Sequence, residues 1–239
     1  ANIWGEYIQT PEYFEYMAFP RLLAMSEVQW TQPEHKDFES FARRLDKEFE
    51  RLDYCGVNAC RNFYEVNQAG AWNKSQQTYE VTLNTFCPDA DIYYAVNDST
   101  VNTSSSLYET QIPLDEDATI YSAVYRSGKP LGKVTRKSFA VNKATGCDYT
   151  CNPEAGWEHL NKGFGLTDGR RGYARDMRRW ISFYQDTVQI VVELKKPQKV
   201  KEVAFSSLWR PVNEIWPARA IGVSVSMDGQ TFIPVGTKR

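Results

Sequence analysis

Two side chains near the start of the sequence could bind a sugar. Trp4 and Glu6 stand two positions apart, and residues at that spacing point to the same side of a β-strand. A large aromatic ring packs on the C–H face of a pyranose, while a carboxylate accepts hydrogen bonds from sugar hydroxyls. The residue types alone leave a second interpretation open, in which Trp4 is a structural residue and Glu6 a surface carboxylate.

The other reactive residue types predict no catalytic cluster. The adjacent acidic residues within Leu114–Asp117 lie in a predicted loop, and we expect them to form a solvated turn. Of the 5 cysteines, Cys147 and Cys151 could either form a disulfide or remain free thiols. The cysteine spacings do not fit a zinc site, and neither histidine lies beside a cysteine pair.

The composition is that of an ordinary folded protein. The 239 residues carry 28 Lys and Arg against 30 Asp and Glu, and the formal net charge of -2 excludes a basic surface that binds nucleic acid or membrane through net charge. Aromatic residues make up 14%, a content that suits both β-sandwiches and carbohydrate-binding surfaces. No apolar run approaches the roughly 18 residues of a membrane span. The length predicts one or two domains, or several small ones, and Ala1 in place of Met predicts a processed or cut start.

Residues 1–60 predict a short strand followed by helices. Residues 1–6 are expected to end a strand, and Thr10-Pro11 to open a helix, since Thr is a good N-cap and Pro fits the first helical position. Pro20 should interrupt that helix. The apolar segment 17–25 around it predicts burial. Strand, loop and helix is the order of one unit of a (β/α)8 barrel, and a single unit cannot close a barrel. We therefore expect the apolar face at Phe19, Leu22 and Leu23 to be partly exposed or to pack on the β segment that follows residue 60.

A second helix is expected from Thr31, with Glu34 in capping-box spacing, to a stop at Gly56. Its predicted core stripe consists of Phe38, Phe41, Leu45, Phe49 and Leu52, and its predicted solvent-side ion pairs are Glu39–Arg43 and Arg44–Glu48.

From Gln77 onward the hydrophobic pattern changes to a period of two, which is typical of strands. In the middle segment we expect strands at 81–86, 92–96, 120–126 and 134–141, with turns at Asn97-Asp98 and Ser127-Gly128. After the loop 142–153 we expect strands at 188–194, 200–208, 221–227 and 231–235, the last two joined by Asp228-Gly229. Both sets predict β-sandwiches, and the second one ends abruptly after a hairpin.

The run Asn2-Ile3-Trp4-Gly5-Glu6-Tyr7-Ile8, followed by Phe19-Pro20-Arg21 and by Ala24-Met25-Ser26-Glu27 with Trp30, resembles the last strand and helix of family 20 glycoside hydrolases. These are the β-N-acetylhexosaminidases. The resemblance implies a (β/α)8 barrel that removes terminal N-acetylglucosamine or N-acetylgalactosamine with retention. The family's nucleophile is the substrate's own 2-acetamido oxygen, which departs from the two-carboxylate scheme.

The resemblance also implies roles for individual residues. Trp4 would wall the pocket of the terminal sugar, and Glu6 would accept hydrogen bonds from its distal hydroxyls. Arg21, Glu27 and Trp30 match the helix motif, and we expect them to be structural. The catalytic Asp-Glu pair of the family lies on an earlier barrel strand, so we expect no catalytic residue in this chain and no activity from it alone.

The middle and last segments show further resemblances. Residues 91–99, Leu107-Tyr108 and 120–123 resemble the accessory β-sandwich that follows such barrels, although Val96-Asn97-Asp98 replaces the usual Thr-Asp-Gly. The segments 166–169, 188–194 and 223–232, with Trp180, resemble a discoidin-type (coagulation factor 5/8 C-type) jelly roll. That resemblance implies glycan binding, for which Trp209 and Trp216 could offer a platform or else serve packing, and a structural Ca²⁺ to which Asp168 is the candidate ligand.

These observations predict a multi-domain, mainly β chain. Residues 1–60 are expected to be the last strand and helices of an incomplete (β/α)8 barrel, 61–144 an accessory fibronectin-III-like sandwich, and 145–239 a truncated discoidin-like jelly roll. The expected function is that of a C-terminal fragment of an exo-acting, retaining β-N-acetylhexosaminidase. Its partners would be N-acetylhexosamine-terminated glycans and not nucleic acid. It would need no cofactor other than the structural Ca²⁺ implied for the discoidin-like segment. The family resemblance also implies export. The alternative is a non-catalytic carbohydrate-binding or structural β-sandwich protein.

Overall fold

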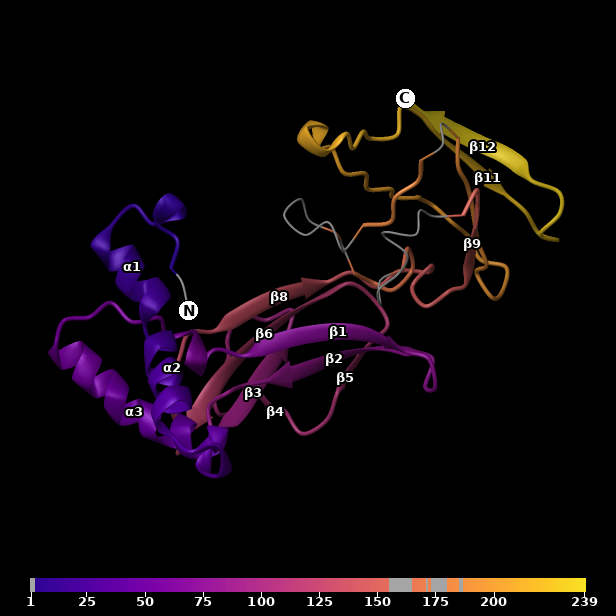
Figure 1. Ribbon diagram of the computed structural model, residues 1–239. Helices are drawn as coiled ribbons and strands as arrows, with labels where there is room; N and C mark the ends of the chain where they lie inside the picture. Colours follow the sequence, from indigo (N-terminus) through magenta and orange to yellow (C-terminus); the bar gives the residue numbers. More distant parts are fainter. Residues whose placement is uncertain (1–2, 155–164, 171, 173–179, 185–186) are drawn as a thin grey trace. The chain divides into compact units, whose positions relative to one another are not determined.

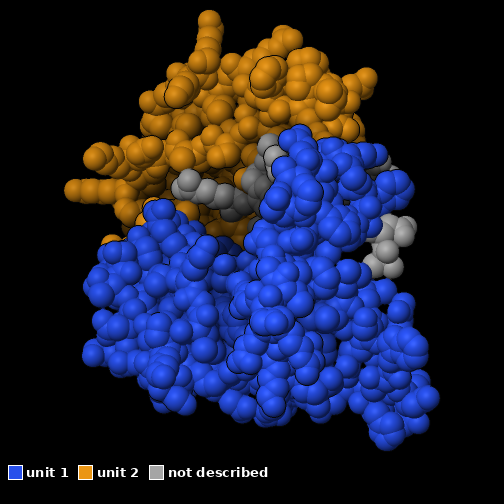
Figure 2. All heavy atoms as spheres, turned by 90° about the vertical axis from the view of Figure 1, so that its left-hand side faces the viewer, with its two compact units in different colours: residues 1–69, 81–112, 118–138 blue, residues 70–80, 113–117, 139–239 orange. Residues whose placement is uncertain are grey.

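The computed structural model describes residues 3–154, 165–170, 172, 180–184 and 187–239 (Figure 1). The chain divides into two compact units, coloured in Figure 2: unit 1 comprises 1–69, 81–112 and 118–138, and unit 2 comprises 70–80, 113–117 and 139–239. More of the described residues lie in strands than in helices, so the chain is mainly β. No helix in these described residues is long and apolar enough to cross a membrane.

The start of the described chain is a turn and not the predicted barrel strand. The 3₁₀ helix η1 spans Gly5–Tyr7, and the Ile8 N–H donates to the Gly5 carbonyl over 3.2 Å. Residues 3–60 contain no strand, so a strand at 3–6 would leave the backbone groups of both its edges without partners. The expectation of a strand at residues 3–6 is wrong, and the assignment of this segment to a barrel stays a prediction.

Two short helices follow, as the proline pattern predicts. Helix α1 spans Pro11–Ala18, and the Thr10 hydroxyl caps it by accepting from the Tyr13 N–H at 3.2 Å. Helix α2 spans Arg21–Trp30 and begins directly after Pro20. The Arg21 guanidinium donates to the Met17 carbonyl at 2.8 Å, which satisfies one of the last carbonyl groups of α1.

Helix α3 spans Phe38–Tyr54 and begins later than the predicted Thr31. The residues before it form a separate 3₁₀ turn, η2 (Pro33–His35), and the carboxylate of Asp37 caps α3 by accepting from the Glu39 N–H at 2.9 Å. Asp is a stronger N-cap than Thr, which explains the shift. The helix ends with Gly56 at a φ of 69°, so the predicted stop is confirmed.

One of the two predicted ion pairs on α3 forms. Arg43 contacts Glu39 at 2.6 Å. Arg44, however, directs both terminal nitrogens to Glu27 of α2, at 2.7 and 3.2 Å, and forms no pair with Glu48. A bidentate contact between two helices is more stabilising than an exposed i,i+4 pair, which explains why Arg44 pairs with Glu27 and not with Glu48.

The buried face of α3 forms a hydrophobic cluster with the two preceding helices. Its buried members are Leu45, Phe49 and Ala59, and the partly buried side chains packed on them are Phe19, Leu23, Phe41, Leu52, Phe63 and Tyr64. Leu22 remains exposed. The expected partial exposure of the apolar segment is therefore confirmed at Leu22, whereas Phe19 and Leu23 pack on α3.

One antiparallel sheet contains β4 (Ser106–Leu107), β3 (Asp91–Val96), β6 (Ala118–Arg126) and β7 (Lys129–Pro130) in that order, with β8 (Thr135–Phe139) also paired to β6. The register of β3 on β6 runs from Asp91 opposite Tyr125 to Val96 opposite Ile120. Both Ser127 and Gly128 have positive φ, as a two-residue hairpin between β6 and β7 requires. The predicted strands at 92–96 and 120–126 are confirmed.

A second sheet contains β1 (Asn67–Asn73), β2 (Thr78–Asn84) and β5 (Ile112–Leu114), in that order. Gln68 of β1 donates to the Ser122 hydroxyl of β6 at 2.8 Å, and both side chains are buried. This contact joins the inner faces of the two sheets, as in a β-sandwich.

The strand pattern of the middle segment predicts a core of Val81, Leu83, Phe139 and either Tyr93 or Tyr94, and three of these positions are correct. Val81, Leu83 and Phe139 are buried. Tyr93 and Tyr94 are only half-buried, and Ile92 is the buried residue of β3. Tyr93 instead lies on a small cluster beside Tyr125, with its ring 5.3 Å away in edge-to-face orientation.

The later part of the chain contains two antiparallel strand pairs. Strand β9 (Tyr149–Asn152) pairs with β10 (Gln189–Val192), and β11 (Ile221–Val225) pairs with β12 (Ile233–Lys238), both antiparallel. The turn at Asp228-Gly229 is confirmed, with Gly229 at a φ of 71°. The expected strand at 200–208 is wrong: these residues pair with no other strand in the described chain, and Val203 and Phe205 are exposed. The jelly roll and the three domain boundaries stay predictions.

Candidate functional site

The two residues expected to bind sugar lie in the turn at the start of the chain. Trp4 has an extended backbone and directly precedes η1, which contains Glu6 and Tyr7. Trp4 is 70% exposed and Tyr7 81%, and Glu6 is also exposed. Because this segment is a turn, Trp4 and Glu6 do not share one face of a strand as expected. Their side chains are nevertheless accessible to a ligand.

Of the helix residues matched to the same motif, two make the structural contacts expected of them. Arg21 satisfies the end of α1, and Glu27 pairs with Arg44. Trp30, by contrast, is 87% exposed at the end of α2, so it does not serve the core of this chain.

The adjacent acidic residues lie in an exposed loop of the described structure. Asp115, Glu116 and Asp117 are exposed in the loop between β5 and β6. The Asp117 carboxylate accepts from the Val141 N–H at 2.8 Å, which is a loop-stabilising contact. The expected solvated turn is confirmed.

Trp209 and Trp216 flank a small turn in unit 2. Arg210 and Ile215 form an isolated antiparallel bridge, with N–H to carbonyl distances of 3.0 and 3.2 Å, around the 3₁₀ turn η6 (Pro211–Asn213). The two indoles stand directly before and directly after this bridged pair, and both are 68% exposed. The residues of this turn therefore present two large aromatic surfaces to solvent, and neither indole is a core residue.

Asp168 serves the backbone around it. Its two carboxylate oxygens accept from the Gly165 and Arg170 N–H groups, each at 2.9 Å, around Gly169 at a φ of 74°. Ca²⁺ takes six to eight oxygen ligands, and no group of three or more His, Cys, Asp or Glu side chains suited to a metal lies among the described residues. The described surroundings of Asp168 thus do not fit Ca²⁺ by themselves, and its role as a ligand stays a prediction.

Three of the five cysteines lie where their surroundings disfavour the thiolate. All five are free thiols, including Cys147 and Cys151. Burial raises the pKa of Cys147 and of Cys151, and it also raises the pKa of Cys87 against the opposing effect of Arg126. Burial therefore disfavours the thiolate, which is the nucleophilic form, at these three side chains.

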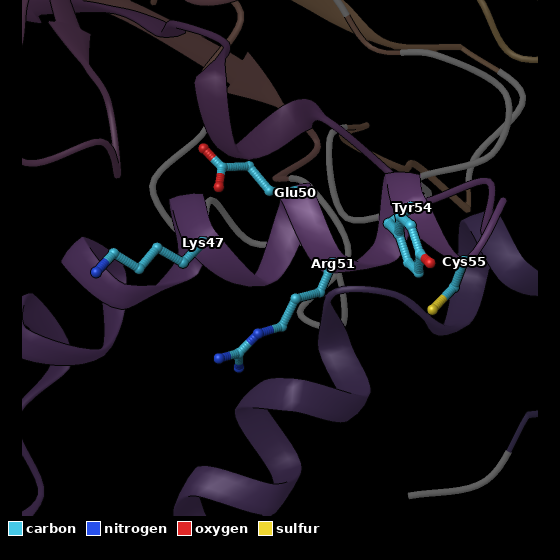
Figure 3. A pocket seen from close by; sticks show the side chains of 5 residues that line it. All are labelled: Lys47, Glu50, Arg51, Tyr54 and Cys55. Atoms are coloured by element: carbon cyan, nitrogen blue, oxygen red, sulfur yellow. The ribbon is translucent and has the colours of Figure 1, made fainter.

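A shallow pocket of about 530 Å³ lies on the solvent side of α3 (Figure 3). It is lined by Lys47, Glu50, Arg51, Tyr54 and Cys55, all of them exposed. In Figure 3, Glu50 and Arg51 point to opposite sides of the helix and do not converge on a common point. The arrangement is that of a solvated helix face and not of a substrate site.

A polar cluster that the sequence did not predict links α3 to the sandwich. The Asp46 carboxylate accepts from Arg126 at 2.6 Å and from the Tyr64 hydroxyl at 2.6 Å. Two signals could have found it: Asp46 borders the apolar stripe at Leu45, and Arg126 ends a strand of otherwise uncharged residues.

Comparison with protein-family models gives two matches. Residues 1–33 match the catalytic domain of glycosyl hydrolase family 20, and residues 67–136 match the chitobiase/β-hexosaminidase C-terminal domain. The chain is also similar to a β-hexosaminidase of Porphyromonas gingivalis (strain ATCC BAA-308 / W83), with 52% identity over 58 residues. That stretch is 24% of this chain and 8% of the relative, so the match spans less than a tenth of the relative's length.

These matches confirm two of the resemblances expected from the sequence. The segment around Trp4 and Glu6 matches the family 20 catalytic domain, and the strands from β1 to β8 match the C-terminal domain that accompanies it. None of them bears on the discoidin-like segment. In its first 33 residues and in residues 67–136, the chain is thus similar to family 20 glycosyl hydrolases and to the C-terminal domain of chitobiases and β-hexosaminidases.

Proposed function

We propose that this chain is the C-terminal part of a β-N-acetylhexosaminidase that removes terminal N-acetylglucosamine or N-acetylgalactosamine from glycans. The observation that carries the proposal is the order of the two family matches within one chain, a catalytic-domain segment followed by the C-terminal domain of the same class of enzyme. The similarity to a β-hexosaminidase supports the same activity. We also propose that the protein is exported from the cytoplasm, because the glycans that such enzymes cleave lie outside it.

In the proposed enzyme, Trp4 and Glu6 bind the terminal sugar. The Trp4 ring packs on the C–H face of the pyranose, and the Glu6 carboxylate accepts hydrogen bonds from the hydroxyls farthest from the scissile bond. The reaction is exo-acting and retaining, with the substrate's acetamido oxygen as nucleophile. The acid/base group and its partner come from residues outside this chain, because general acid catalysis needs a group within hydrogen-bond reach of the glycosidic oxygen.

A second sugar contact is proposed at Trp209 and Trp216. Two exposed indoles on one short turn suit stacking on sugar rings, and no acid or base is needed for binding alone. Such a contact would hold the enzyme near its glycan without taking part in turnover. It is also the feature that the alternative, a non-catalytic carbohydrate-binding protein, would require.

The test is turnover of chromogenic N-acetylglucosaminide and N-acetylgalactosaminide substrates by two proteins. One is the 239-residue chain, and the other is the chain preceded by its upstream coding sequence. We expect hydrolysis only with the longer protein. Hydrolysis by the 239-residue chain would contradict the absence of the catalytic pair, and no hydrolysis by the longer protein, with glycan binding retained, would favour the non-catalytic alternative.

A further inference from the structure

Helix α3 is joined to the sandwich by a partly buried ion pair. Arg126, the last residue of β6, donates to Asp46 at 2.6 Å, and the two side chains are 28% and 31% exposed. The second terminal nitrogen of Arg126 donates to the Pro88 carbonyl at 3.0 Å and contacts the Cys87 sulfur at 2.9 Å. The guanidinium therefore links the helix, the end of β6 and the loop between β2 and β3.

The other oxygen of Asp46 is held by Tyr64. The hydroxyl donates at 2.6 Å, and burial, together with this hydrogen bond to Asp46, raises the pKa of Tyr64, so the phenol stays a donor. Both oxygens of the Asp46 carboxylate thus have a partner. A partly buried carboxylate with two good donors is stabilising as a set, whereas loss of one donor leaves a charge without full compensation.

A second set of contacts lies nearer the start of the same helix, within about two turns of Asp46. Arg43 directs two nitrogens to the carboxylate of Asp89, at 2.8 and 3.2 Å, and the Phe38 ring meets Phe86 edge-to-face at 6.0 Å. These side chains are more exposed than Asp46 and Arg126, so each contact contributes less. Together these contacts hold the first half of α3 against the loop 86–89.

Helix α3 also holds α1 and α2. Arg44 pairs with Glu27, and Phe19 and Leu23 pack on Leu45 and Phe49. The chain after α3 adds hydrogen bonds from the Asn58 N–H to the Glu15 carboxylate, at 2.8 Å, and from the Cys60 N–H to the Phe19 carbonyl, at 3.0 Å. The short helices α1 and α2 therefore have their main partners on α3 and the segment directly following it.

We infer that the sandwich acts as an intramolecular scaffold for the segment that matches the catalytic domain. Helix α3 connects the two, and the Asp46–Arg126 ion pair is its main contact with the sandwich. Helices as short as α1 and α2 are marginal in water and depend on packing. Their packing partner α3 is in turn fixed by the sandwich, and all these residues belong to the same compact unit. This role is independent of catalysis and holds whether or not the chain is part of a glycosidase.

The test is amide hydrogen exchange of the 239-residue chain, followed by mass spectrometry of peptides from α1–α2, α3 and β3. In Asp46→Asn and Arg126→Gln, removal of a charge-assisted hydrogen bond should accelerate exchange in α3 and in α1–α2 by roughly tenfold or more, while β3 keeps its protection. The double variant should exchange about as fast as either single variant, because both substitutions remove the same interaction.

Two matched variants serve as controls. Arg51→Gln breaks the pair with Glu48 on the same helix and should change α1–α2 exchange by less than about twofold, as expected for an exposed pair. Glu27→Gln breaks the ion pair between α2 and α3, so amide exchange in α2 should become faster while exchange in α3 stays at the wild-type rate. The inference is overturned if Asp46→Asn leaves α1–α2 exchange at the wild-type rate, or if α1–α2 and β3 lose protection together in Asp46→Asn, which would indicate one cooperative unit without a scaffold.

Discussion

Gly146 lies directly against the indole of Trp72, so closely that a Cβ atom on Gly146 would stand 2.0 Å from the ring atom Cε2. Gly146 also has a φ of 72°, which side chains rarely adopt. The ammonium group of Lys195 lies 5.0 Å from the centre of the same ring and donates to the side-chain amide oxygen of Gln77 at 2.5 Å. Trp72 is therefore held by a backbone contact and by a cation–π contact, both within unit 2.

Gly146→Ala should destabilise the protein strongly. The left-handed backbone costs about 1–2 kcal/mol for a residue with a Cβ, and forcing a methyl group into the ring adds about 1–3 kcal/mol. The matched control is Gly229→Ala, which has a φ of 71° but no atom within 4 Å of the added Cβ, so only the backbone cost applies. Urea unfolding followed by tryptophan fluorescence measures both. If the free energy of unfolding falls equally in the two variants, the contact with Trp72 adds nothing to the destabilisation.

The β11–β12 turn should weaken in acid. The Asp228 carboxylate accepts from the N–H groups of Thr231 and Gln230, at 2.8 and 2.9 Å, and these bonds, with the Ser226 hydroxyl, hold its pKa well below the usual range. Since the folded pKa is the lower one, the stabilisation is present above the unfolded pKa of about 3.9 and is lost as pH falls below it.

Amide exchange of Gln230 and Thr231, corrected for intrinsic rates, measures this loss between about pH 5 and pH 2, on either side of the unfolded pKa. We expect protection to fall with pH in the wild-type chain. Asp228→Asn keeps the acceptor oxygen but cannot titrate, so its protection should not depend on pH. The same pH dependence in both proteins would assign the effect to another group.

The local pattern of the sequence predicted the elements that depend on local chemistry. Thr10 and Pro11 start α1, Pro20 separates the helices and Gly56 ends α3, because each acts through its own backbone geometry. One local miss is the start of α3, which follows the Asp37 cap and not Thr31. The other misses are elements whose backbone needs a distant partner. The expected strands at residues 1–6 and 200–208 do not form in the described residues, since no neighbouring strand pairs with them.

The same distinction applies to the side chains. Arg44 has an acid four residues away, yet it pairs with Glu27 on another helix, and sequence spacing cannot rank these two partners. The Asp46–Arg126 pair joins residues that are distant in sequence, so only the tertiary structure reveals it. For the candidate site, the sequence identified Trp4 and Glu6 by type, but it placed them wrongly on one strand face.

Tyr64 should make stability fall at alkaline pH. Its pKa is raised, first by burial and then by the hydrogen bond to Asp46. The contribution of the neutral phenol is therefore complete below the unfolded pKa of about 10 and is lost as pH rises above it. Tyr64→Phe removes the titrating group and the hydrogen bond, which should cost about 1–2 kcal/mol at neutral pH and less at higher pH.

Thermal unfolding of both proteins between about pH 7 and pH 11.5, a range that spans the ordinary tyrosine pKa, measures this difference. The difference in unfolding temperature between wild type and Tyr64→Phe should become smaller above about pH 10, the ordinary tyrosine pKa. Tyr54→Phe is the control, because Tyr54 is 93% exposed, and that substitution should leave the curve unchanged. A gap that stays constant with pH would show that Tyr64 does not titrate differently in the folded state.

The last prediction concerns Glu6 and Trp4 in the longer protein of the proposed function. A carboxylate that binds sugar hydroxyls makes charge-assisted hydrogen bonds worth about 1.5–3 kcal/mol each, so Glu6→Gln should lower kcat/KM by roughly 10- to 100-fold without abolishing activity. Loss of a general acid would cost about 10²–10⁴-fold, which separates a binding role from a catalytic one. Trp4→Ala should raise KM through lost contact with the sugar face.

Glu34→Gln is the matched control for these kinetics, because Glu34 is an exposed carboxylate on the 3₁₀ turn η2, outside the proposed sugar contact. Steady-state kinetics on an N-acetylglucosaminide, with circular dichroism to confirm folding, compares the variants. Glu6→Gln should lose activity while Glu34→Gln keeps it, because only Glu6 is proposed to meet the substrate. If Glu6→Gln retains the wild-type kcat/KM, Glu6 does not bind the distal hydroxyls and is a surface carboxylate of the turn. If it loses more than about 10⁴-fold, Glu6 acts on the bond that breaks and not on the distal hydroxyls.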